Sequence, residues 1–127
     1  MPPRWHLLRR LYALGPVAIV IAGCLSPTLP LPPPDEPNTI TSSEEGIWLV
    51  GGDCIAGAEV VVMNEETGRG EVFLDLDRKG RYSVAIEGEA CDVIVISQSL
   101  STEESAEVRV TLEEVADGVE VNPDACP

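Results

Sequence analysis

The chain has 127 residues, enough for one small domain, and 22 acidic residues outnumber eight basic ones to give a formal net charge of −14 at pH 7. Such a surface repels phosphate backbones and anionic headgroups, which excludes nucleic acid as a partner. Acidity of this degree is otherwise typical of a soluble domain in a crowded compartment.

The N-terminal stretch predicts export. Three arginines in the first ten residues precede an apolar segment, 11–22, that is too short to span a bilayer. The small residues that end this segment, directly before Cys24, resemble the lipobox of bacterial lipoproteins. The resemblance implies a signal peptide over residues 1–23, cleavage between Gly23 and Cys24, and lipidation of Cys24. The alternatives are an uncleaved anchor and an ordinary signal peptide.

The residues after the cysteine bear on localisation. Leu25 and Ser26 follow Cys24, without the aspartate that commonly retains such lipoproteins at the inner membrane. We therefore expect a protein of the cell envelope whose lipid holds it to a membrane. In a cell with two membranes, the outer one is favoured.

Cleavage before Cys24 also changes the chemistry of the chain. It removes His6, the only histidine, so no imidazole remains to activate a serine or cysteine nucleophile. It leaves five basic residues against all 22 acidic ones, a formal charge of −17. Since the sequence also has no phosphate loop and no complete dinucleotide fingerprint, we expect no catalytic residues, no enzyme activity and no cofactor.

A proline-rich stretch follows the cysteine. Six prolines fall between Leu25 and Asn38, and this composition predicts an extended spacer about 40 Å long. The polar residues Thr39 to Glu45 are expected to continue it. The predicted organisation is a lipidated cysteine and linker over 24–45, one domain over 46–121 and a tail over 122–127.

The domain itself has the short periods of an all-β fold. Strands of three to seven residues are separated by turn residues about every ten positions, which predicts a small antiparallel β-sandwich. Val72, Leu74 and Leu76 share one face, and Phe73 is expected on an exposed face. The predicted strands cover residues 47–50, 59–64, 71–77, 82–86, 92–97, 108–112 and 119–121.

The segment from Thr102 to Ala116 has two interpretations. Ser101 to Glu104 has the form of a helix capping box, and three apolar residues further on lie roughly on one helical face. Against a helix, residues 108–112 alternate strictly and are rich in β-branched side chains. We favour a strand.

Three cysteines remain if Cys24 carries lipid. An oxidising envelope favours one disulfide, which would reinforce a domain this small. We prefer the pairing of Cys54 with Cys91 over that of Cys54 with Cys126, because Cys54 and Cys91 both lie in turns of the predicted domain. One observation opposes this preference: in a simple meander, the order of the turns places Cys54 and Cys91 at opposite ends of the sandwich. The wide spacing of the cysteines does not fit a zinc site.

Asp75 and Asp77 are the one weak metal candidate. The run from Asp75 to Gly80 begins like a calcium loop, but Lys79 takes the place of an oxygen ligand and Ile86 that of the final glutamate. An EF-hand is excluded. A looser surface calcium site stays open, and an ordinary acidic hairpin turn is preferred.

Two turns resemble a known family. Gly57-Ala58 opening a strand, and the run from Asp77 through Gly80 to Tyr82, are similar to the carboxypeptidase regulatory-like domain, over about Ile47 to Ser97. Ile55-Ala56 stands where that family commonly has a proline. The resemblance implies a transthyretin-type or Ig-like sandwich that serves as an accessory module without catalytic residues. Bacterial Ig-like modules share nearly the same pattern.

These observations predict a non-catalytic, lipid-anchored envelope protein that presents one acidic β-sandwich to a protein or glycan partner, or serves a structural role. The alternatives are a carbohydrate- or calcium-binding module and a lipoprotein subunit of an envelope or secretion complex. Sugar binding needs stacking aromatics, and only Trp48, Phe73 and Tyr82 remain after cleavage, of which Phe73 is the exposed candidate.

Overall fold

The structure is a computed structural model that describes residues 30–127. The predicted signal peptide, the cleavage site at Gly23 and the lipidated Cys24 lie outside these residues. The described part of the chain contains ten strands and no helix, in this order: β1 (Thr39–Glu44), β2 (Ile47–Asp53), β3 (Glu59–Asn64), β4 (Gly70–Leu74), β5 (Arg81–Glu87), β6 (Val93–Leu100), β7 (Glu103–Glu104), β8 (Val108–Thr111), β9 (Val115–Ala116) and β10 (Val119–Glu120).

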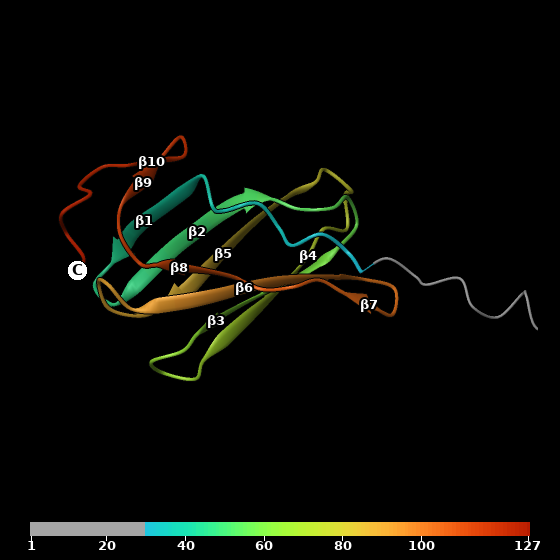
Figure 1. Cartoon of the computed structure of the whole chain (residues 1–127), viewed down its shortest axis with the longest axis horizontal. Coiled ribbons are helices and arrows are strands. Elements are labelled where there is room, and N and C mark those ends of the chain that lie inside the picture. The colour runs from blue at the N-terminus through green and yellow to red at the C-terminus, as the bar shows by residue number, and fades with distance from the viewer. Residues whose placement is uncertain (1–29) are drawn as a thin grey trace, which may run out of the picture.

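The strands form two antiparallel sheets packed face to face (Figure 1). One sheet has the order β10-β9-β1-β2-β5, and the other has the order β4-β3-β6-β7, with β8 also paired to β6. This arrangement confirms the predicted all-β sandwich. Among residues 30–127 no helix is long and apolar enough to cross a membrane.

The core lies between the sheets and follows the alternation of the sequence. On β5, Tyr82, Val84 and Ile86 are buried, while the residues between them are exposed. The facing sheet contributes buried side chains from β3 and β6, and Leu112 closes the core after β8. Because side chains in strands alternate between faces, each strand supplies every second residue to this layer.

The ambiguous segment after Ser101 is strand, as favoured. β8 pairs with β6 so that Val110 lies opposite Ile94. Leu112 is fully buried, and its backbone N–H donates to the carbonyl of Asp92 at 2.8 Å. β-branched side chains are favoured in a pleated, half-buried strand such as β8 over a helix, where their rotamers are restricted.

The proline-rich segment is not the free spacer that we expected. Residues 39–44 form β1, which pairs with β2 along its length, and Ile40 is only 2% exposed in the core. Pro34 and Pro37 are buried against the sandwich as well. The predicted boundary at residue 46 is therefore too late: the folded unit begins near Leu31, which forms a bridge with Ser105. Composition alone did not predict β1, because only one apolar residue holds this strand in the core and the remainder is held by backbone pairing with β2.

The orientation of β4 also differs from the prediction. Val72, Leu74 and Leu76 are 58%, 51% and 83% exposed, whereas Phe73 turns inward and packs against the core. The register explains the reversal, because Phe73 lies opposite the fully buried Val60 and cross-strand neighbours share a face. Phe73 is therefore not the exposed aromatic that the sequence suggested.

Candidate functional site

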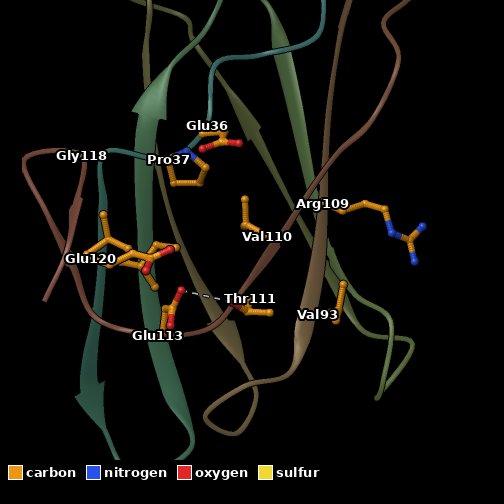
Figure 2. A pocket seen from close by; sticks show the side chains of 11 residues that line it. Glu36, Pro37, Val93, Arg109, Val110, Thr111, Glu113, Gly118 and Glu120 are labelled. Atoms are coloured by element: carbon orange, nitrogen blue, oxygen red, sulfur yellow. Dashed lines mark hydrogen bonds between the residues drawn. The ribbon is translucent and has the colours of Figure 1, made fainter. Parts of the chain in front are cut away.

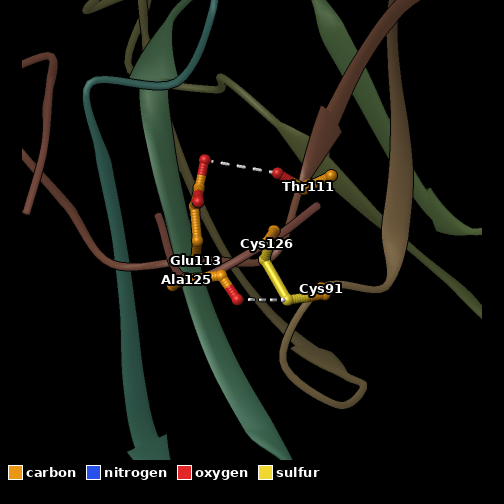
Figure 3. Close-up of a disulfide and its surroundings, with 5 residues drawn as sticks. All are labelled: Cys91, Thr111, Glu113, Ala125 and Cys126. Atoms are coloured by element: carbon orange, nitrogen blue, oxygen red, sulfur yellow. Dashed lines mark hydrogen bonds between the residues drawn. A yellow bond between two sulfur atoms is a disulfide. The ribbon is translucent and has the colours of Figure 1, made fainter. Parts of the chain in front are cut away.

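The disulfide joins Cys91 to Cys126, with their Cα atoms 5.4 Å apart (Figure 3). The preferred pairing of Cys54 with Cys91 is wrong. Cys91 lies in the turn before β6, and its N–H donates to the carbonyl of Leu112 at 2.8 Å, which brings the start of the C-terminal stretch beside it. The predicted tail, 122–127, then runs back to this turn, where the carbonyl oxygen of Ala125 lies 3.4 Å from the Cys91 sulfur.

Cys54 has a free thiol in the turn between β2 and β3. This turn lies at the opposite end of the sandwich from the turn between β5 and β6, which contains Cys91 (Figure 1). Burial raises the pKa of this thiol, and the negative charges of Asp75 and Asp53 raise it further. A thiol with a raised pKa is a poor nucleophile at neutral pH. Cys54 therefore does not have the electrostatics of a catalytic cysteine.

Asp75 organises the turn between β4 and β5. Its Oδ2 accepts hydrogen bonds from the N–H groups of Gly57 at 3.0 Å and Gly80 at 2.8 Å, and its Oδ1 accepts one from Lys79 at 3.1 Å. These backbone donors hold the pKa of Asp75 below its usual value. Asp77 is exposed beside it. Within residues 30–127 no group of three metal-ligating side chains gathers here or elsewhere, so the geometry lends the calcium hypothesis no support.

The aromatic side chains of the domain pack in the core or against it. The Trp48 indole donates to the carbonyl of Gly88 at 3.2 Å, and the Tyr82 ring lies so close to Gly52 that a Cβ there would be 2.9 Å from its hydroxyl. The Tyr82 hydroxyl has no hydrogen-bond partner among the described residues, and burial raises its pKa. With Phe73 inward too, no aromatic face of residues 30–127 is presented as a stacking platform.

A pocket of about 500 Å³ opens between the edge formed by β8 and the edge formed by β1, β9 and β10 (Figure 2). Ile40, Val110 and Val115 form its apolar floor. Three carboxylates lie around it, and they come from separate parts of the chain: Glu36 precedes β1, Glu113 follows β8, and Glu120 belongs to β10.

The carboxylates of this pocket interact with one another. The charge of Glu113 raises the pKa of Glu120, and partial desolvation, a hydrogen bond with Glu113 and the charge of Glu36 act in the same direction. Arg109 also borders the pocket, but its guanidinium points away and pairs with Glu65 (Figure 2). The pocket is thus negative, lacks a compensating cation among the described residues, and suits a positively charged group that has an apolar stem.

No local pattern in the sequence singles out these three glutamates. Glu36 was assigned to the spacer, and the other two were part of a general acidity with no local pattern. Their proximity arises because β1 and β9 pair at Ile40 and Val115, which joins the N-terminal segment to the last hairpin. Nothing in the spacing of the residues indicates that pairing.

The fold and this pocket define a two-sheet all-β domain with an acidic recess at one edge. Comparisons with known proteins give no match: no family model, no curated protein and no solved structure matches the chain.

Proposed function

We propose that the chain is a non-catalytic, lipid-anchored envelope protein whose single acidic β-sandwich binds a protein partner. The pocket between β8 and β9 carries this proposal, because it combines three carboxylates with an apolar floor. A lysine or arginine side chain of a partner matches both parts, with its methylene stem on the floor and its charge among the carboxylates. The lipobox before Cys24 and the loss of His6 on cleavage support the anchor and the absence of catalysis.

The electrostatics also favour a basic partner. A formal charge of −17 after cleavage raises the rate of encounter with positively charged surfaces and makes that rate fall with ionic strength. The resemblance to the carboxypeptidase regulatory-like domain supports the same class of role, since such domains are accessory modules. A subunit of an envelope or secretion complex would be one form of it.

The anchor is tested first. Globomycin treatment and the Cys24→Ala variant should each leave the signal peptide attached, and Cys24→Ala should in addition abolish lipidation, which mass spectrometry of the purified protein reports directly. An unchanged size and membrane fractionation in both cases would refute the lipid anchor.

The pocket is tested by affinity purification from solubilised membranes. The Glu113→Gln/Glu120→Gln variant should lose at least ten-fold of the partner recovered by the wild type, and recovery by the wild type should fall as salt rises. The matched control is Glu103→Gln/Glu104→Gln, which removes the same charge from β7, outside the pocket. Equal losses in both variants would show that only overall charge matters and would refute the pocket as the site.

A further inference from the structure

β8 is an edge strand, and its outer side has no backbone partner in the described part of the chain. It pairs with β6 alone. The Leu112 N–H donates to the Asp92 carbonyl, so the backbone groups of Leu112 and, two residues earlier, of Val110 face β6. The N–H and carbonyl groups of Arg109 and Thr111 therefore point to the open side. Such unpaired groups are a template for an added strand.

The acidic pocket opens along this free edge of β8. Val110 and Thr111 line it together with the three glutamates (Figure 2). The Val110 side chain is half-buried and packs against the core. Because cross-strand neighbours share a face, a residue paired with Val110 would direct its own side chain to that face and into the pocket.

The N-terminal segment borders the pocket across from β8 but does not fill the free edge. Leu31 bridges to Ser105 just before β8 begins. Ile40 pairs with Val115 shortly after β8 ends. Between these two contacts, four of the seven residues 31–37 are prolines, which have no N–H to donate to a neighbouring strand. The edge of β8 is thus left open along the pocket.

The charge beside the free edge is negative. Of the described residues that line the pocket, Arg109 alone is basic, and its guanidinium pairs with Glu65. Asp117 adds a further acidic side chain next to Gly118, which lines the pocket in the turn between β9 and β10. A strand added to β8 is complementary to these charges when the side chain that enters the pocket is a lysine or arginine.

We propose that β8 accepts an extended segment of the partner as an additional antiparallel strand, with a lysine or arginine opposite Val110 and its charge among the glutamates. Antiparallel pairing is the more stable form, and every strand pair of the two sheets uses it. The inference rests on the proposed function and adds the way in which the partner binds. Backbone hydrogen bonds at Arg109 and Thr111 supply affinity, and the pocket supplies specificity.

Synthetic peptides test this pairing with the full-length protein in a neutral detergent. The parent peptide is Ac-Ser-Thr-Val-Lys-Val-Thr-Ser-NH2, whose lysine takes the position opposite Val110. In antiparallel pairing, the two valines of the peptide direct their N–H groups toward β8 and the two threonines direct theirs away. One analogue is N-methylated at both valines, and its matched control is N-methylated at both threonines. A third peptide has norleucine in place of lysine, which keeps the apolar stem without the charge.

We expect calorimetry to show at least ten-fold weaker binding of the valine-methylated and norleucine peptides than of the parent, because each loses hydrogen bonds or charge pairing. The threonine-methylated peptide should bind within two-fold of the parent. Thr111→Pro removes one N–H of the free edge and should also weaken binding at least ten-fold, whereas Thr111→Val keeps that N–H and should not. Near-ultraviolet circular dichroism checks that both variants are folded.

Equal affinities of the two N-methylated peptides, or no binding of the parent, would overturn the strand pairing. If the norleucine peptide were still the weaker ligand, the pocket would remain a site for a basic side chain. Equal affinities of the parent and norleucine peptides would refute the pocket as a cation site and the proposed function with it. A wild-type chain that sediments as a dimer and becomes monomeric as Thr111→Pro would assign the free edge to a second copy and overturn the proposal.

Discussion

Loss of the Cys91–Cys126 disulfide should strongly destabilise the domain. The bond closes a loop with a sequence separation of 35 that contains β6 to β10, half of the described strands. In the chain-entropy treatment, opening such a loop lowers the free energy of unfolding by about 4 kcal/mol. For a domain of this size, that corresponds to a fall in melting temperature of about 15–30 °C.

The perturbation is Cys126→Ser, since Cys91 has a left-handed φ of 71° that complicates replacement. The matched control is Cys54→Ser, which removes a thiol that forms no disulfide. Thermal unfolding is followed by circular dichroism with and without dithiothreitol. The reductant should lower the wild-type and Cys54→Ser melting temperatures to that of Cys126→Ser and leave Cys126→Ser unaffected. A Cys54→Ser variant that loses as much stability as Cys126→Ser would refute the pairing.

Three further predictions test the corrected parts of the fold. Ile40→Ala should lower the free energy of unfolding by about 2–5 kcal/mol in urea titrations because Ile40 is a core residue, whereas the exposed Val119→Ala should change it by less than about 0.5 kcal/mol. The pKa of Asp75 is lowered in the fold, so its ionised carboxylate stabilises the fold at pH values above the unfolded-state pKa. This stabilisation is lost as the pH falls through the folded-state pKa. Asp75→Asn should therefore reduce the free energy of unfolding at pH 7 and flatten its decline below about pH 4. Gln98→Ala removes the hydrogen bond to Pro32 and should make residues 31–37 cleavable by a protease that leaves the wild type intact there.

β5 and β8 were predictable because their side chains alternate. On β5 every second residue is apolar, and no other arrangement buries Tyr82, Val84 and Ile86 together. On β4 the same pattern was ambiguous, because both sets of alternating residues are apolar at Phe73 and Leu74. Only the register with β3, which no local feature of the sequence reveals, decides that Phe73 faces the core.

The candidate site was harder to predict for the same reason. The two pairings that create it, β1 with β9 and Cys91 with Cys126, join residues separated by 75 and 35 positions. A turn such as Asp75 to Gly80 is encoded locally, so its residues could be identified in advance, although the hydrogen bonds that the Asp75 carboxylate accepts from the backbone were not. No local sequence pattern predicts the acidic pocket, because its carboxylates come from the first and the last residues of the folded part of the chain.

The docked proline segment changes what the anchor would do. A free spacer over residues 25–38 would hold the domain about 40 Å from the lipid and let it turn in any direction. With Leu31 and Pro32 fixed to the sandwich, only residues 24–30 are left between the proposed lipid and the domain, so an anchored domain would remain close to the bilayer. The pocket is built mainly on β8, β9 and β10, whereas the chain leaves the sandwich beside β7, where Leu31 bridges to Ser105. A short tether would thus keep the end of the sandwich at Leu31 near the lipid and leave the acidic pocket to a basic partner, an orientation that a long flexible spacer could not maintain.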